Sequence, residues 1–241
     1  MLLIKLLFPL NLTSIRLNKF IPLNNTWGRS RHLKDVCKQL VICASALFIS
    51  FMVLPASAAQ SVILVYGDSL SAAYGITQEQ GWVSLLQQRI KQNKLNYAVV
   101  NASISGETTS GGLSRIEKAL KEHQPKFILI ELGANDGLRG LPIAEMRKNL
   151  NTMITTSQQY KAKVVLIGMR IPPNYGFKYT RDFKESYEIL AKQYKLPLVP
   201  FLLDGVAGKR ELNQDDGLHP VAKAEPTVLD NVWGVLKSEI K

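Results

Sequence analysis

Residues 62–240 alternate between short β-branched runs and longer amphipathic segments, and this alternation constrains the fold more than any other feature. The β-branched runs span residues 62–66, 97–101, 127–132, 164–169 and 198–200. The amphipathic segments, which have the length and apolar spacing of helices, span residues 81–93, 112–123, 143–159, 182–194 and 226–240. Strands that alternate with helices predict a parallel sheet with helices on both faces. We therefore expect residues 60–241 to form one α/β domain, with three layers around a doubly wound five-stranded parallel sheet.

The first 59 residues are typical of a secretory signal peptide with an extended N-terminal region. Their apolar run, Leu40–Leu54, has 15 residues, fewer than the ~20 that a membrane-spanning helix needs. Small residues follow it at 56–59, and a basic stretch precedes it, made of Arg29, Arg31, Lys34 and Lys38. We expect export to the periplasm or secretion, with cleavage after Ala58 or Ala59. Retention of this leader as an N-terminal anchor is the alternative.

The chain is basic, but its charge pattern does not indicate a nucleic-acid partner. It has 30 Lys and Arg against 19 Asp and Glu, a formal net charge of +11. The leader holds seven basic residues and one aspartate, which leaves +5 for residues 60–241. Along the sequence these charges are spread singly, without a basic helical stripe or interleaved aromatic residues. Examples are Lys91, Lys121, Lys148, Lys184 and Lys209.

Cysteine and histidine are too few for disulfide or zinc chemistry. Both cysteines, Cys37 and Cys43, lie in the leader, as does His32. The remaining histidines are His123, which ends a polar helical segment, and His219. A catalytic zinc site built on two or three histidines is therefore excluded. We expect no metal and no cofactor.

Three loops that follow predicted strands carry unusual sequences, and ligands of parallel sheets bind at such loops. Residues 67–71 (GDSLS) place Ser69 directly after the first strand. Ser71 stands where the nucleophile elbow G-x-S-x-G has its second glycine, which disfavours an α/β-hydrolase. We expect Asp68, beside this serine, to be an acceptor that stabilises the turn.

The other two loops resemble a phosphate-binding loop and a tight turn. Residues 101–112 approach the glycine spacing of a phosphate-binding loop, but Gly112 and Leu113 stand where Lys and Ser or Thr are needed, which disfavours nucleotide binding. Residues 133–137 (GANDG) tolerate unusual backbone angles, and Asn135 carries an amide donor. Taken alone, Asn135 fits a turn as well as a catalytic site.

A fourth motif lies before the last predicted helix, at residues 215–220 (DDGLHP). A nucleophilic serine needs a base, and that imidazole needs a third group to orient it. Asp216 and His219 are three residues apart and can form such a pair within one turn. A histidine with only a structural role is the alternative at this position.

Together these four motifs resemble the SGNH (GDSL) hydrolase family, which is named for its serine, glycine, asparagine and histidine. The resemblance covers residues 61–241 and is strongest to the exported thioesterases, arylesterases and lysophospholipases of that family. It extends to residues 101–106, 131–140, 170–176 and 214–220. The resemblance implies a small enzyme of flavodoxin-like architecture with a five-stranded parallel sheet, in agreement with the strands predicted above.

The resemblance also implies a role for each residue of the site. Ser69 would be the nucleophile, His219 the general base and then acid, and Asp216 the residue that orients His219. The oxyanion hole would consist of the backbone N–H groups of Ser69 and Gly106 and the side-chain amide of Asn135. The reaction would be acyl transfer to water through an acyl-serine, without cofactor, on fatty acyl thioesters and oxygen esters.

Two apolar loops, residues 137–142 and 171–179, are candidates for the walls of the acyl site. Ordinary loop packing is the alternative explanation of their apolar character. We expect the chain to act as a monomer without an obligate protein partner. The candidate substrate-binding residues are Leu138, Leu141, Ile171, Pro172 and Tyr175.

Three other functions are open at this stage. A carbohydrate or small-ester deacetylase would share the triad but would have a polar cleft. An acyltransferase would use the same acyl-enzyme and pass the acyl group to an alcohol or lysolipid. A lipid-binding module without activity would be favoured by a broken triad, whereas the sequence contains all three residues.

Overall fold

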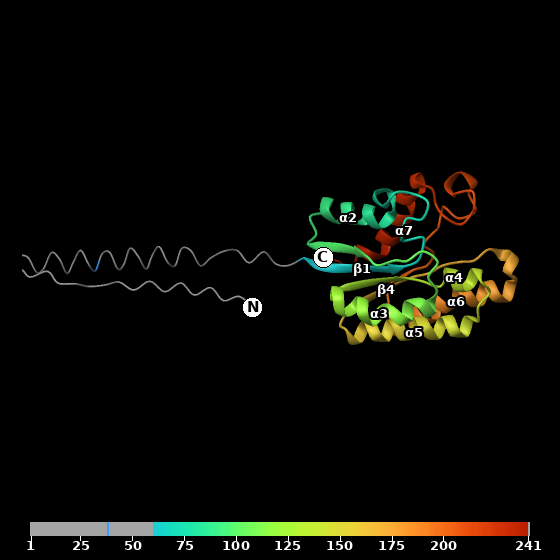
Figure 1. Cartoon of the computed structure of the whole chain (residues 1–241), viewed down its shortest axis with the longest axis horizontal. Coiled ribbons are helices and arrows are strands. Elements are labelled where there is room, and N and C mark those ends of the chain that lie inside the picture. The colour runs from blue at the N-terminus through green and yellow to red at the C-terminus, as the bar shows by residue number, and fades with distance from the viewer. Residues whose placement is uncertain (1–37, 39–59, 241) are drawn as a thin grey trace, which may run out of the picture. The chain divides into compact units, whose positions relative to one another are not determined.

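The computed structural model describes residues 60–240, together with Lys38 (Figure 1). The predicted leader, its cleavage site and the alternative anchor therefore lie outside the described residues. Residues 60–240 belong to one compact unit. In these residues no helix combines the length and the apolar character that crossing a membrane requires.

Five strands form one parallel sheet in the order β2-β1-β3-β4-β5, which confirms the predicted fold class. The chain moves outward from β1 to β2, returns to β3 on the other side of β1, and then continues to β4 and β5. The predicted strands agree with the observed ones to within two residues at each end. Their bounds are β1 Ser61–Gly67, β2 Tyr97–Asn101, β3 Phe127–Glu131, β4 Lys163–Ile167 and β5 Leu198–Val199.

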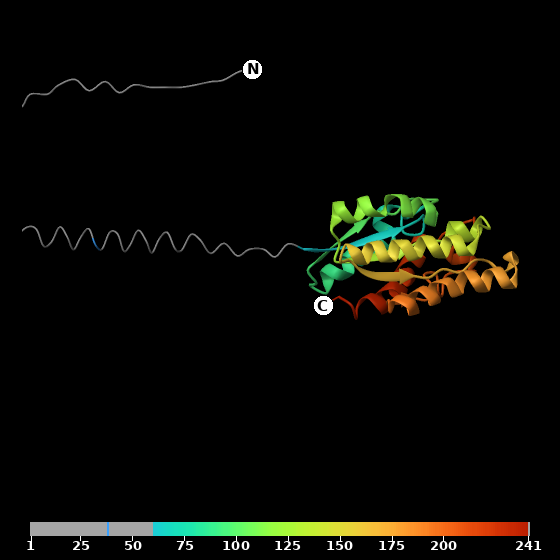
Figure 2. The same ribbon diagram turned by 90° about the horizontal axis from the view of Figure 1, so that it is seen from below.

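Helices cover both faces of the sheet and complete the three layers. The helices α2 and α7 pack against each other on one face, while α3, α5 and α6 lie side by side on the other (Figures 1 and 2). The helices are α2 Trp82–Gln92, α3 Thr109–His123, α4 Ala134–Leu138, α5 Ile143–Gln159, α6 Phe177–Tyr194 and α7 Glu225–Leu236. Short 3₁₀ turns are η1 Gln78–Gln80, η2 Pro173–Tyr175, η3 Arg210–Leu212 and η4 Ala222–Ala224.

Helix ends differ from the prediction where local capping decides them. The helix α3 begins three residues before the predicted Gly112, because the hydroxyl of Thr108 accepts a hydrogen bond from the N–H of Gly111. The helix α6 begins five residues earlier than predicted, after Gly176, whose φ of 92° turns the chain out of η2. The short helix α4 was not predicted, since the sequence GANDG reads as a turn.

The core lies between the sheet and the two helical layers. The middle of β1 and all of β3 are buried, as expected of central parallel strands covered on both faces. Each long helix contributes one apolar stripe to the core, for example Met146, Leu150 and Met153 of α5. Because the sheet is parallel, the loops that carry the sequence motifs all leave it at its carboxyl edge.

Candidate active site

The loop after β1 forms a tight turn that holds Ser69 at the carboxyl edge of the sheet. As expected, Asp68 acts as the turn acceptor, taking a hydrogen bond of 3.1 Å from the N–H of Leu70. Beneath the turn, Oε2 of Glu131 accepts hydrogen bonds from the hydroxyl of Ser71, at 2.7 Å, and from the N–H of Asp68. A Cβ on Gly67 would lie 2.5 Å from this oxygen, so the turn can approach Glu131 only with glycine at that position.

Ser69, His219 and Asp216 lie in a continuous hydrogen-bonded line. Oγ of Ser69 is 2.8 Å from Nε2 of His219, and Nδ1 of His219 is 2.6 Å from Oδ2 of Asp216. Oδ1 of Asp216 accepts hydrogen bonds from the backbone N–H groups of Leu218 and His219. The local turn thus orients the carboxylate toward the imidazole, and Gly217, at φ 70°, permits that turn. This arrangement can deprotonate a serine hydroxyl and stabilise the resulting imidazolium.

The same hydrogen bonds set the ionisation of Asp216. Partial burial raises the pKa of Asp216, but the backbone N–H groups of His219 and Leu218 and the imidazole lower it further. The net pKa therefore lies below the usual value for aspartate. Asp216 is ionised near neutral pH, as a residue that stabilises an imidazolium must be.

The three predicted oxyanion donors differ in whether they already have hydrogen-bond acceptors. Within residues 60–240, the backbone N–H groups of Ser69 and Gly106 have no hydrogen-bond acceptor. Gly106 has φ 78°, and a Cβ there would meet nothing closer than 3.8 Å. Glycine is therefore needed for the backbone angle and not for lack of space. The amide of Asn135, the third donor, contacts Oδ2 of Asp68 at 3.1 Å and the carbonyl of Glu107 at 3.0 Å.

Two buried carboxyl groups lie behind these donors. Burial raises the pKa of Asp68 to about 6, although hydrogen bonds from Leu70 and Asn135 oppose the shift. Burial, and the neighbouring charge of Asp68, raise the pKa of Glu131 well above its usual value. Glu131 is fully buried, and its Oε2 accepts both the hydroxyl of Ser71 and the N–H of Asp68, so this carboxyl group supports the turn from below.

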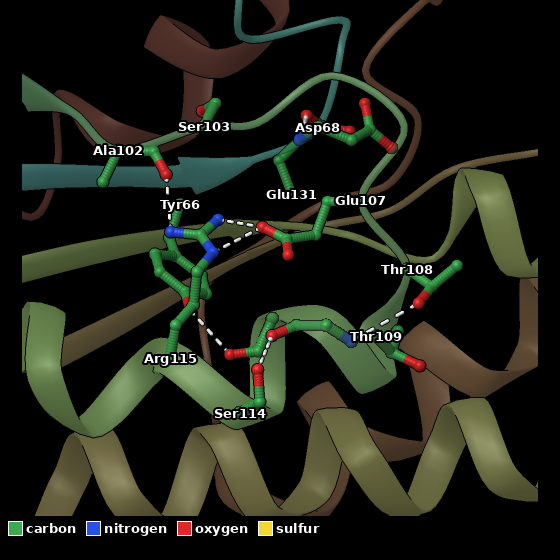
Figure 3. A network of polar contacts seen from close by, with 12 residues as sticks. Tyr66, Asp68, Ala102, Ser103, Glu107, Thr108, Thr109, Ser114, Arg115 and Glu131 are labelled. Atoms are coloured by element: carbon green, nitrogen blue, oxygen red, sulfur yellow. Dashed lines mark hydrogen bonds and ion pairs between the residues drawn. The ribbon is translucent and has the colours of Figure 1, made fainter.

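A guanidinium holds the loop that carries Gly106 (Figure 3). Arg115 of α3 donates from Nη1 to the carbonyl of Ala102, at 2.8 Å, and from Nε to the carboxylate of Glu107. Its guanidinium lies 4.0 Å from the centre of the Tyr66 ring, whose hydroxyl donates to the carbonyl of Gly112. Arg115 therefore fixes both ends of residues 102–107, and with them the carbonyl that orients Asn135.

A cavity of about 150 Å³ opens beside Ser69 and His219. Asp68 and Asn135 also border it, together with Arg170. Its remaining walls are apolar and come from four loops at the carboxyl edge, namely Leu70, Ala134, Leu138, Met169, Ile171, Pro172, Leu203 and Leu218.

Comparison with known proteins agrees with this geometry. Residues 65–224, more than half of the chain, match the model of the GDSL-like lipase/acylhydrolase family. The chain belongs to this family. The resemblance stated from the sequence motifs is thus confirmed, and the chain is an esterase of the SGNH type.

Three curated relatives of this acylhydrolase are similar over most of their length. The esterase TesA of Pseudomonas aeruginosa is 47% identical over 78% of this chain and 94% of its own. The arylesterase of Vibrio mimicus is 43% identical over 78% of this chain and 94% of its own. The thioesterase 1/protease 1/lysophospholipase L1 of Escherichia coli K12 is 39% identical over 76% of this chain and 86% of its own. A crystal structure of TesA superimposes with a TM-score of 0.73 at 48% identity, covering 74% of this chain and 99% of the other.

The predicted substrate-binding residues of this acylhydrolase divide into two groups. Leu138, Ile171 and Pro172 line the cavity beside Ser69, as expected, but Leu141 and Tyr175 do not. Tyr175 is turned away because its hydroxyl donates to the carbonyl of Leu138, and its ring faces an outer groove. Leu141 follows Gly140, which at φ 64° directs the chain outward, and its side chain is exposed.

The sequence motifs did not identify several residues that position the site. Gln214 donates to the carbonyls of Tyr74 and Pro220, and so ties the His219 loop to the loop after Ser69. The ring of Tyr74 lies 4.5 Å from that of His219. The sequence could have indicated Glu131, since it is a carboxylate at the end of an otherwise apolar strand. The hydrogen-bond partners of Arg115 and Gln214 lie in distant segments, so the sequence gives no signal for them.

No group of three or more His, Cys, Asp or Glu side chains in residues 60–240 could hold a metal ion.

Proposed function

We propose that Ser69, His219 and Asp216 are the catalytic triad of this acylhydrolase and that its substrates are fatty acyl thioesters and oxygen esters. The supporting observation is the hydrogen-bonded line from Oγ of Ser69 through His219 to Asp216, with contacts of 2.8 and 2.6 Å. It ends at a largely apolar cavity bordered by Ser69 and Asn135, two of the three residues that carry the proposed oxyanion donors.

In the first step, Oγ of Ser69 attacks the carbonyl carbon of the substrate while Nε2 of His219 takes the hydroxyl proton. The carbonyl oxygen becomes an oxyanion, which accepts hydrogen bonds from the N–H groups of Ser69 and Gly106 and from the amide of Asn135. Asp216 stabilises the imidazolium. His219 then protonates the leaving alcohol or thiol as the bond to the acyl group breaks, which leaves an acyl-serine.

In the second step, His219 removes a proton from a water molecule, and the resulting hydroxide attacks the acyl-serine. A second oxyanion forms at the same donors and collapses, returning the proton from His219 to Oγ of Ser69. Acid and free enzyme are the products. A thiolate is a better leaving group than an alkoxide. The same two steps can therefore cleave thioesters as well as oxygen esters.

The cavity supports substrates with an apolar acyl group. Its volume of about 150 Å³ lies below the ~300 Å³ at which ligand pockets usually begin. Short acyl groups therefore fit within it, and longer chains extend past Ile171 and Pro172 toward solvent. The names of the relatives, esterase, arylesterase and thioesterase/lysophospholipase, support oxygen esters and thioesters, lysophospholipids included.

We further propose that the enzyme is exported and acts as a monomer. The basic stretch, the 15-residue apolar run and the small residues at 56–59 support export.

The test is hydrolysis of p-nitrophenyl esters and acyl-CoA thioesters of graded length by residues 60–241. Ser69→Ala and His219→Ala should each lower turnover by several orders of magnitude, and the double variant should be little slower, since triad members act together. Ser105→Ala, which changes an exposed serine next to Gly106, is the matched control and should stay active. A fluorophosphonate should form a single adduct, on Ser69.

Wild-type turnover in Ser69→Ala would refute the proposed triad. Hydrolysis restricted to acetyl esters would instead favour a deacetylase, and preferential transfer to an added alcohol would favour an acyltransferase.

A further inference from the structure

The end of the domain opposite the catalytic cleft is strongly basic. We define the lysine end as the segments that run from the last turn of each long helix to the first residue of the next strand, together with the end of α7. In a parallel sheet all these segments lie at the amino edge, whereas Ser69, Asn135 and His219 lie at the carboxyl edge. Its nine lysines are Lys91, Lys94, Lys121, Lys126, Lys161, Lys163, Lys192, Lys195 and Lys237.

The charge of the lysine end exceeds that of the whole domain. Nine lysines there face only two carboxylates, Glu122 and Glu239, a balance of +7. Residues 60–241 as a whole carry +5, so all other residues, with Arg89 and Lys241 counted among them, sum to −2. The lysines that are spread singly along the sequence are thus gathered at one end by the fold.

These lysines are exposed and largely free of ion pairs. Among the described residues, Lys121 alone of the nine has a carboxylate within ion-pair distance, that of Glu117. Lys126 and Lys163 lie over the rings of Tyr97 and Phe127, at 5.3 and 5.6 Å. Arg89, at the same end, is paired with Asp230 and adds no free charge.

Helix stabilisation accounts for only part of this charge. Lysine near a helix C-terminus offsets the negative end of the helix dipole, about −0.5 charge per helix. Five helices end here, so about −2.5 of partial charge opposes the +7 and leaves roughly four to five positive charges. In addition, Lys126 and Lys163 lie beyond the helix ends, at the starts of β3 and β4. The excess therefore needs another explanation.

An open groove of about 370 Å³ lies within the lysine end, at the starts of β3, β4 and β5. Three lysines line it, Lys161, Lys163 and Lys195, and Glu239 is the one carboxylate among the lining residues. Tyr194 and Gln158 add further polar groups. The groove can admit a phosphate-bearing group that the three ammonium groups neutralise.

We propose that the lysine end docks the domain on an anionic phospholipid bilayer, with lipid phosphates at the groove between Lys161, Lys163 and Lys195. Clusters of this size bind anionic bilayers electrostatically. Residue 60 precedes the start of β1 at this same end, so a leader retained as an anchor would join the domain on its docked side. A domain docked here holds its catalytic cleft away from the lipid surface and open to substrate.

Nucleic acid is the other polyanion that the charge could attract. Proteins that bind single strands combine basic grooves with exposed aromatic rings on which bases stack. Tyr97 and Phe127, the rings beneath Lys126 and Lys163, are buried. The lysine end therefore fits the phosphates of a lipid surface better than it fits bases.

The test uses residues 60–241, because the described core is complete within 60–240 and the crystallised TesA chain matches this part over 99% of its length. Sedimentation is measured with vesicles of phosphatidylcholine alone and with added phosphatidylglycerol, at low and high salt. The domain should bind only the anionic vesicles, and less at high salt. Lys161→Gln/Lys163→Gln/Lys195→Gln should bind roughly ten- to a hundred-fold more weakly.

The matched control is Lys148→Gln/Lys184→Gln/Lys209→Gln, which removes the same charge from elsewhere on the surface. It should bind nearly as wild type, and both triple variants should keep wild-type turnover of a soluble short-chain ester. Equal loss in the two variants would show a net-charge effect and overturn the docking surface, as would absence of wild-type binding at low salt. Displacement by inorganic phosphate would reassign the groove to free phosphate. Tighter, lysine-dependent binding of a single-stranded oligonucleotide would favour nucleic acid.

Discussion

At the scale of single residues, the amide of Asn135 already makes two hydrogen bonds, and its proposed catalytic role adds a third acceptor, the oxyanion. Both protons of its amide already have acceptors, Oδ2 of Asp68 and the carbonyl of Glu107. If the amide stabilises an oxyanion, it must turn from one of these acceptors toward the substrate.

Asn135→Ala should lower kcat by ~2.7–4 kcal/mol of transition-state stabilisation and change KM little. Asn135→Gly should keep the fold and lose the same rate, whereas a residue needed only for the turn would tolerate glycine. Steady-state kinetics with a soluble ester, together with thermal unfolding, separate these effects.

Asn135→Asp is a sharper test, because it keeps the shape of the side chain but makes it an acceptor only. Near neutral pH it also places a carboxylate against Asp68 and the carbonyl of Glu107. We expect it to be at least as inactive as Asn135→Ala. A fully active aspartate variant would remove Asn135 from the oxyanion hole.

At the scale of elements, the site depends on contacts that join a loop or helix to a distant one. Arg115 on α3 holds the Gly106 loop, and Gln214 joins the loop of His219 to that of Ser69. Asp136 on α4 accepts hydrogen bonds from the N–H and hydroxyl of Thr109, so it joins α4 to the start of α3. These contacts bring donors from separate loops to one place.

Arg115→Met should lower kcat ~10- to 100-fold with little change in KM, since the donors lose their alignment while the cavity remains. It also leaves the carboxylate of Glu107 without its partner, which should lower the melting temperature. The double variant Arg115→Met/Glu107→Gln removes that charge, so it should recover stability but not turnover. Recovery of both would mean that Arg115 acts on stability alone.

Glu225, the first residue of α7, links α7 to the start of α2. It is buried, accepts a hydrogen bond of 2.7 Å from the N–H of Trp82, and has its pKa raised by burial to about 7. The unfolded chain therefore loses this proton at lower pH than the folded one. Stability from this group is complete below the unfolded pKa, about 4.5, and is lost as the pH rises through about 7.

Glu225→Gln, which stays neutral, should therefore be more stable than wild type at pH well above 7, by up to about 3 kcal/mol. Below pH ~4 the difference should vanish, since both side chains are then neutral in both states. Urea unfolding of both proteins across this pH range measures it. A constant difference at all pH values would contradict the assigned pKa.

At the scale of the whole molecule, the domain places its catalytic cleft and its basic surface at opposite edges of the sheet. The carboxyl edge of the sheet carries the cleft, and the amino edge carries the lysine end. The core of the described part of the chain lies within residues 60–240, with β3 as the central strand of the sheet. We therefore expect catalysis to require nothing from residues 1–59.

Removal of residues 1–59 should leave kcat/KM for a soluble short-chain ester unchanged. EDTA should also leave it unchanged, because the proposed mechanism uses only side chains and backbone N–H groups of residues 68–219. Kinetics of the full chain and of residues 60–241, each with and without chelator, check both statements. Loss of activity on chelation, restored by zinc, would contradict the second.

The sequence alone was sufficient for the fold class, the five strands to within two residues, and the local unit of Asp216 and His219. These features depend on periodicity and short spacing, which neighbouring residues determine through side-chain direction and turn geometry. The order of the motifs also predicted which loops meet, because every strand of a parallel sheet ends at one edge. The structure places Ser69 beside His219, 150 residues away, as that reasoning requires.

The tertiary structure alone decided which residues of those loops face the cavity and what supports them. Leu141 and Tyr175 belong to the same two loops as Leu138 and Ile171, yet a left-handed glycine and a hydrogen bond to a neighbouring loop turn them outward. The partners of Arg115 and Gln214, and the gathering of scattered lysines at one end, likewise have no local signal. They follow from the packing of segments that are distant in sequence, which no spacing along the chain encodes.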